Sequence, residues 1–177
     1  GAGIGIIATA VTLLADPNSA VITSSRVRAA LQDGEPERAA EMLGHDWTVT
    51  GTVQMGDQRG RTIGFPTANI PLGNLLHPAF GVYAVQIFEA EPDQPFRLLG
   101  NGVANIGVRP TVEDRGVLCE AHLFDQQVDL YGRRLAIGLK SFIRPERKFT
   151  GIDELTAQIA KDARAARELL PSIKETA

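Results

Sequence analysis

The chain has 177 residues, of which 44% are hydrophobic and 22% are charged, which is the composition of a globular protein with an ordinary core. Its net charge of −3 argues against a broad nucleic-acid-binding surface, and no apolar run is long enough to span a membrane. A single cysteine, Cys119, excludes an intramolecular disulfide and a cysteine-rich zinc site; with no signal peptide visible, we expect a cytoplasmic protein.

The first 44 residues contain one apolar run and two short helical patterns. The run Ile4–Leu14 is rich in Ile, Val and Thr and predicts a strand that ends in a turn. Residues 24–44 predict two short helices, the first capped by Ser24 or Ser25 and the second ending at Gly44.

From Trp47 onward the pattern changes to short strands with turn residues between them. About six strands with mostly hairpin-length connections predict a closed antiparallel barrel. The predicted strands are Trp47–Gln54, Thr67–Ile70, Gly81–Glu89, Leu98–Ile106, Val117–Phe124 and Leu135–Phe142.

A single long helix is predicted at the end, over Asp153–Leu170, with Pro171 terminating it. Its apolar side chains recur at helical spacing and should pack against the barrel. They are Leu155, Ile159, Ala163, Ala166 and Leu170.

The segment Gly60–Ile70, with the sequence GRTIGFPTANI, forms a rigid polar turn unsuited to a helix or a core strand. Arg61 can meet a phosphate. Thr67 and Asn69 lie two residues apart and would project on the same side of an extended chain, which places two neutral oxygens together. Such ligands suit a Mg²⁺ ion held mainly by substrate phosphates. The alternative is a structural loop in which Asn69 bonds its own backbone.

Glu120 lies within the predicted strand Val117–Phe124. If that strand is extended, Glu120 and His122 share one face with Leu118 and Phe124. A carboxylate between apolar neighbours indicates a partly enclosed site. The alternative is an ordinary solvated strand residue.

The run Gly51–Ile70, with its Gly-Phe-Pro-Thr-Ala-Asn core, resembles the signature of riboflavin kinases. The resemblance covers roughly residues 47–170, and several motifs in the same order make it specific. The further matching motifs are Gly81-Val-Tyr-Ala, Val103-Ala-Asn-Ile-Gly, Arg109-Pro-Thr-Val, Glu120-Ala-His-Leu-Phe-Asp, Asp129-Leu-Tyr-Gly and Phe142-Ile-Arg-Pro-Glu-Arg-Lys-Phe.

This resemblance implies a mainly β fold, a six-stranded antiparallel Greek-key barrel with a C-terminal helix. It also implies a set of ATP-side residues. Gly56 and Arg61 would touch ATP, while Thr67 and Asn69 would meet the ATP phosphates and Mg²⁺. Glu120 would be the catalytic base.

The flavin side of the site is implied in the same way. The isoalloxazine ring is expected to dock on the segment from Arg144 to Ile152, with Arg144, Thr150 and Ile152 as contacts. The expected small-molecule partners are therefore riboflavin or FMN and ATP or ADP, with Mg²⁺ as the cofactor. Neither nucleic acid nor a membrane is an expected partner.

Residues 21–44 resemble the end of the adenylyltransferase module that precedes the kinase in bacterial bifunctional riboflavin kinase/FAD synthetases. That module also needs an upstream His-containing nucleotide motif, whereas His45, His77 and His122 all lie too late in this chain. We therefore expect residues 1–44, a short strand and a helical pair, to be a remnant of that module and residues 45–177 to be the kinase domain. The adenylyltransferase module is expected in cis in a longer parent chain.

The function implied is transfer of the ATP γ-phosphoryl group to the ribityl 5′-hydroxyl of riboflavin, giving FMN and ADP. Two alternatives remain. One is a barrel that binds a flavin or nucleotide without catalysis, since such barrels have many functions. The other is a part of a bifunctional FAD synthetase, which the missing nucleotide motif opposes.

Overall fold

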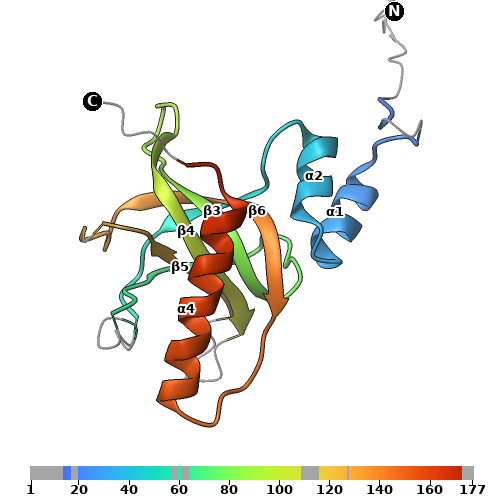
Figure 1. The fold of residues 1–177 in the computed structure, drawn as a ribbon. Coiled ribbons are helices and arrows are strands. Elements are labelled where there is room, and N and C mark those ends of the chain that lie inside the picture. Colours follow the sequence, from blue (N-terminus) through green and yellow to red (C-terminus); the bar gives the residue numbers. More distant parts are fainter. Residues whose placement is uncertain are drawn as a thin grey trace, which may run out of the picture.

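The computed structural model describes residues 14–16, 20–56, 60, 64–108, 116–126 and 128–172 (Figure 1). The strand expected over Ile4–Leu14 lies outside the described residues except for Leu14, and Arg61 lies outside them as well. In the part that is described, no helix is long and apolar enough to cross a membrane.

Six antiparallel strands form one sheet in the order β1-β6-β3-β4-β5-β2. Strands β3, β4 and β5 form a meander, and β6 returns to lie beside β3, which is the Greek-key arrangement expected. A bridge between Gln54 and Asn69 joins the two end strands and nearly closes the barrel. The strands are β1 (Thr48–Thr52), β2 (Ala68–Pro71), β3 (Gly81–Glu89), β4 (Arg97–Val108), β5 (Val117–Leu123) and β6 (Arg134–Pro145).

Alternation along each strand separates the barrel interior from its outer surface. In β5, Cys119, Ala121 and Leu123 are buried in the interior, while Glu120 and His122, which alternate with them, are half-buried on the outer side. The predicted face assignment of this strand is therefore confirmed. The interior is filled by large apolar side chains, among them Tyr83, Ile70, Ile87, Ile106 and Ile137.

Helix α4 (Ile152–Leu169) lies against the outer face of the sheet, in front of β3 and β4 (Figure 1). Only the C-terminal half of its apolar stripe packs closely. Ala166 and Leu170 are buried against Val82, Ala84 and Phe124 of the barrel. In the N-terminal half, the expected packing residues Leu155 and Ile159 instead line a cavity between the helix and the sheet.

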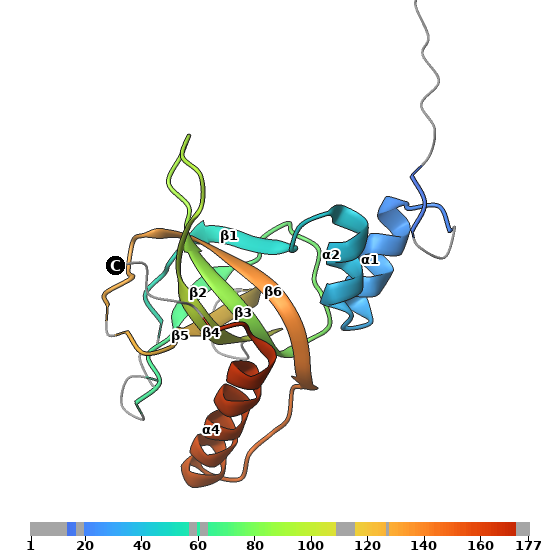
Figure 2. The ribbon, with the colours of Figure 1, turned by 45° about the horizontal axis from the view of Figure 1, so that its top comes forward.

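The helical pair α1 (Ser24–Gln32) and α2 (Pro36–Leu43) packs beside β6, on a different side of the barrel from α4 (Figure 2). The expected cap at Ser24 or Ser25 is wrong by one or two residues. Thr23 has an extended backbone and its side chain accepts from the Arg26 backbone N–H, whereas Ser24 is already helical.

The helical pair is joined to the barrel through apolar contacts and one backbone hydrogen bond. Leu31 is buried in the helical pair, and its carbonyl accepts from the Ala79 backbone N–H at 2.9 Å. Trp47 packs against both the barrel core and the small core of the helices. Packing alone therefore marks no clean boundary at residue 44.

Candidate active site

A row of five side chains crosses the outer face of five neighbouring strands. Asn69 pairs with Glu120, Glu120 with Asn105, Asn105 with Val82, and Val82 with Arg144. Residues directly opposite on neighbouring strands share a face of the sheet. We call these residues the outer row (Asn69, Glu120, Asn105, Val82 and Arg144). The row brings together motifs that are spread over a stretch of 76 residues, from Asn69 to Arg144.

All five members of the outer row line a cavity of about 380 Å³ between the sheet and α4. Much of the remaining lining of this cavity is apolar, so a flat ring could be held there while polar groups of a ligand reach the row. The larger apolar side chains outside the row are Phe65, Val103, Phe149, Ile152, Leu155 and Ile159.

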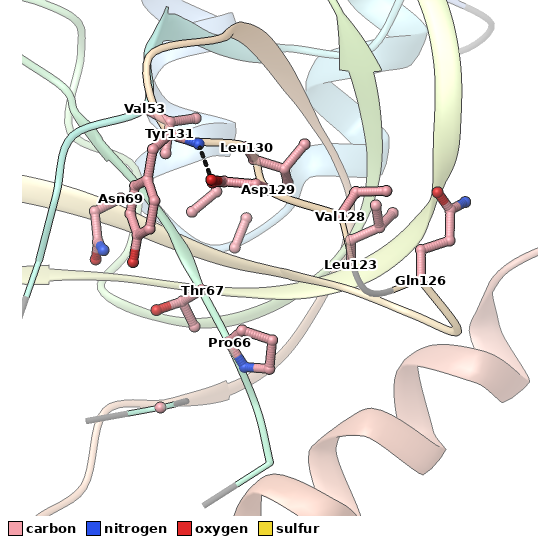
Figure 3. Close-up of a pocket in the computed structure, with 13 residues that line it drawn as sticks. Val53, Pro66, Thr67, Asn69, Leu123, Gln126, Val128, Asp129, Leu130 and Tyr131 are labelled. Atoms are coloured by element: carbon pink, nitrogen blue, oxygen red, sulfur yellow. Dashed lines mark hydrogen bonds between the residues drawn. The ribbon is translucent and has the colours of Figure 1, made fainter. Parts of the chain in front are cut away.

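A second, smaller cavity of about 60 Å³ lies near the β5–β6 connection (Figure 3). The polar ends of Asn69, Tyr131 and Thr67 gather on one side of it, and the Asp129 carboxylate accepts from the Tyr131 backbone N–H at 3.1 Å (Figure 3). Gly60, Thr67 and Asn69 line both cavities. Two ligands bound in the two cavities would therefore meet at these residues.

Asn69 has the environment of a metal or phosphate ligand. Its side chain is 6% exposed, and its Oδ1 accepts no hydrogen bond from the described residues. Leaving such an atom without a partner costs about 1–3 kcal/mol, so a ligand at this position would relieve that cost. Gly56 makes room for the amide, because a Cβ at residue 56 would lie 2.5 Å from Asn69 Nδ2.

The donor set around Asn69 fits Mg²⁺ that arrives with a nucleotide. Within the described ranges, no three acidic, histidine or cysteine side chains gather closely enough to hold a metal ion. The Thr67 hydroxyl and the Asn69 amide offer only two neutral oxygens, so phosphate oxygens and water would have to complete the coordination.

Glu120 is half-buried in the middle of the outer row, between Asn69 and Asn105. On the inner side of the same strand, burial and, secondarily, the charge of Glu120 raise the pKa of the Cys119 thiol to about 12. His122 Nδ1 lies 2.8 Å from the carbonyl of Pro66 and donates to it, and its ring contacts Phe65 edge-on. His122 therefore ties β5 to the segment that carries Thr67.

Arg144 faces the larger cavity, but its guanidinium is engaged by α4. Its Nε and Nη2 donate to the Asp162 carboxylate over 2.7–3.1 Å, and Asp162 is only 4% exposed. Gln158 also donates to Asp162 at 2.8 Å. This bidentate pair fastens the end of β6 to the helix.

Of the other two residues expected on the flavin side, Ile152 lines the larger cavity and Thr150 does not. Ile152 is 56% exposed. The Thr150 hydroxyl instead donates to Glu154 at 2.9 Å, at the start of α4. Hydrogen bonds from the Thr150 backbone N–H and hydroxyl, together with Arg147, hold the pKa of Glu154 below its ordinary value.

Several cavity residues were not singled out from the sequence. Asn105 and Glu146 lie within motifs quoted above, but nothing local assigns them to one cavity. Asp162 left a clearer signal, because it is a charged residue beside the apolar stripe of a helix, between Ile159 and Ala163.

The fold defines a barrel protein whose two adjoining cavities share Thr67 and Asn69 in their lining. Residues 43–170 match the family described as Flavokinase, riboflavin kinase. The chain belongs to the riboflavin kinase family, the ATP-dependent phosphotransferases that convert riboflavin to FMN.

The relatives are longer than this chain. It is 47% identical over 148 residues to the bifunctional riboflavin kinase/FMN adenylyltransferase of Escherichia coli K12, covering 83% of this chain and 45% of the relative. The Bacillus subtilis protein of the same description is 43% identical over 158 residues, 87% of this chain and 48% of the relative. The chain therefore spans about half the length of these relatives.

A solved structure from Streptococcus pneumoniae, described as a macrolide-efflux protein, has a similar fold. It is 32% identical with a TM-score of 0.75, over 89% of this chain and 50% of that one. The shared arrangement extends beyond the 128 residues of the family match, 43–170.

Proposed function

We propose that riboflavin binds in the larger cavity and that the ATP phosphates reach Thr67 and Asn69 from the side of the smaller one, so that the γ-phosphoryl group meets the ribityl 5′-hydroxyl beside the outer row. The observation that carries this proposal is that Thr67 and Asn69 line both cavities, while Glu120 lines the larger one. In-line positioning of the two substrates accounts for most of the catalysis in phosphoryl transfer.

Glu120 is the proposed catalytic base. A primary alcohol is a weak nucleophile, and a carboxylate at its proton helps as the new bond forms. Glu120 is directly opposite Asn69, on the neighbouring strand, so its carboxylate lies beside the proposed phosphate ligands. The proton of the 5′-hydroxyl would pass to Glu120 as the hydroxyl oxygen attacks phosphorus and ADP leaves.

Thr67 and Asn69 are the proposed protein ligands for Mg²⁺ and the ATP phosphates. When bound, the metal would offset negative charge on the phosphate oxygens. Gly56 would keep the Asn69 amide in place, and Arg61 would add a positive charge to the phosphate side. The buried, unsatisfied Oδ1 of Asn69 supports this assignment.

On the flavin side, the proposed contacts are Arg144, Thr150 and Ile152. Ile152 offers an apolar surface to the ring. Arg144, bound to Asp162, would border the ring. Thr150, bound to Glu154, would hold in place the loop that precedes α4.

We further propose that the chain functions in the cytoplasm, next to an adenylyltransferase module in the same parent polypeptide. The bifunctional relatives, about twice as long, support the second point. Residues 1–44 would then be the end of that module, and this chain would make FMN and ADP but no FAD.

The test is to incubate the purified chain with riboflavin and Mg-ATP and to separate FMN, FAD and ADP by chromatography. FMN and ADP in equal amounts are expected. Glu120→Gln should lower turnover roughly 10²–10⁴-fold, the usual effect of losing a general base. The exposed Glu91→Gln is the matched control and should be unchanged. Near-normal turnover of folded Glu120→Gln would remove Glu120 from the mechanism, and a change confined to KM would make it a binding residue.

A further inference from the structure

Residues 146–151 join β6 to α4 and form one wall of the larger cavity, to which they contribute Glu146, Arg147 and Phe149. We call this segment the flavin-side loop. Toward the helix, Arg147 pairs with Glu154 and donates to Gln158 at 3.1 Å. The loop is thus held on its helix side by charged contacts.

On its other side, the same loop is tied to the barrel by Glu146. Its Oε1 accepts from Asn105 Nδ2 on β4 at 3.1 Å. Asn105 is also directly opposite Glu120 in the outer row. One amide therefore stands between the proposed base and the loop that covers the proposed flavin.

Gly107 provides the space for this contact. The three heavy atoms nearest to a Cβ built at residue 107 all belong to the Glu146 carboxylate, with Oε1 at 1.9 Å and Cδ at 2.5 Å. The φ angle of Gly107 is not in the left-handed region, so the backbone itself would accept an alanine. Glycine is therefore required here to seat the carboxylate rather than to form a turn.

We propose that Glu146 is a positioning residue, whose carboxylate, seated on Gly107 and bound by Asn105, sets the flavin-side loop in the arrangement that holds riboflavin. This proposal rests on the proposed function of the larger cavity. If Glu146 leaves its seat, the loop keeps its anchor on α4 but loses its tie to β4. The Phe149 ring, which lies 4.8 Å from the Arg147 guanidinium carbon, would then move away from the cavity with the loop.

The chain offers two independent ways to remove this tie. Glu146→Ala deletes the carboxylate, and Gly107→Ala leaves the carboxylate intact but takes its space. Each should weaken riboflavin binding roughly 10- to 100-fold, the range for losing a hydrogen bond to a charged group. The KM for Mg-ATP should stay within about twofold, because Glu146 lines only the larger cavity.

The double variant Glu146→Ala/Gly107→Ala distinguishes the loss of this one contact from a general loss of structure. With Glu146 already truncated, the added methyl group of Gly107→Ala meets no carboxylate, so the double variant should bind riboflavin no more weakly than Glu146→Ala alone. Glu146→Gln keeps the size and the acceptor oxygen but loses the charge, so its riboflavin affinity should fall between those of the wild type and Glu146→Ala. Gly138→Ala is the matched glycine control, since its Cβ would make only ordinary contacts at 3.6 Å.

Riboflavin binding is measured by quenching of flavin fluorescence without ATP, and turnover separately by FMN formation. Strictly additive losses in the double variant, or an equal loss in Glu146→Gln and Glu146→Ala, would overturn the proposal, the second by showing that the charge itself contacts the ligand. A wild-type chain that binds riboflavin but makes no FMN would refute the catalytic function and leave the binding test intact.

Discussion

Replacing Gly56 by alanine tests the metal and phosphate side of the site while leaving both proposed Mg²⁺ ligands, Thr67 and Asn69, in the chain. A Cβ at this residue would lie 2.5 Å from Asn69 Nδ2, whereas ordinary contacts begin at 3.4 Å, so the amide must retreat by about 0.9 Å. The φ angle of Gly56 is not positive, so the backbone is not strained by the change. Mg²⁺ demands near-ideal geometry at about 2.0–2.1 Å, and a shift of about 1 Å in a reacting group can cost 10²-fold.

We therefore expect Gly56→Ala to lower kcat/KM for Mg-ATP roughly 10- to 100-fold while the affinity for riboflavin is unchanged. The assay varies Mg-ATP at saturating riboflavin and follows FMN by chromatography, with riboflavin affinity taken from fluorescence quenching. Gly138→Ala again serves as the control. A folded Gly56→Ala variant with Mg-ATP kinetics within twofold of wild type would show that the position of the Asn69 amide is not important for ATP use.

Three further predictions concern stability and reactivity. Asp162→Asn breaks the buried pair with Arg144 and should cost about 3 kcal/mol, seen as a lower thermal midpoint, whereas Asp125→Asn at the exposed Arg167 pair should cost less than about 1 kcal/mol; equal midpoints for the two variants would contradict this. The Cys119 thiol, with its pKa raised to about 12 from an ordinary value of 9.0, should resist thiol reagents at pH 8 until the chain unfolds, and its contribution to stability should be complete below pH 9 and lost as the pH rises toward 12. Rapid labelling of the folded chain would refute this burial. A chain that begins at His45 should still make FMN but melt at a lower temperature, because Trp47 and Leu76 lose their partners on the helical pair; failure to obtain folded protein would show that the pair completes the core.

The sequence predicted the barrel well because its strands are short, alternate in burial and are separated by turn residues. The bounds of β3 were predicted as Gly81–Glu89, as observed, and the inner and outer faces of β5 were assigned correctly. The two N-terminal helices and the helix ended by Pro171 were also confirmed. The same local signals placed the N-cap one or two residues late, since Thr23, Ser24 and Ser25 are all good capping residues and only the backbone decides among them.

The assembly of the outer row could not be predicted from the sequence. Its members come from five strands, and their alignment depends on register, which shifts between Val82 and Tyr83 and again between Ala84 and Val85. Such irregularities have no local signal in this sequence, although they decide which side chains are opposite one another. The engagement of Arg144 by Asp162 was missed for a related reason, because it joins a strand to a helix across 18 positions.

The alternation that places the outer row on one face of the sheet and the apolar core on the other also separates two kinds of genetic change. In β5, substitutions at Val117 and Cys119 alter interior packing, whereas those at Glu120 and His122 alter the cavity beneath α4. Substrate preference could thus diversify within this lineage while the barrel interior is left alone. A directed-evolution library confined to the cavity-facing positions of β4, β5 and α4 would accordingly retain folded members at a higher frequency than one that also varies the inward-facing positions.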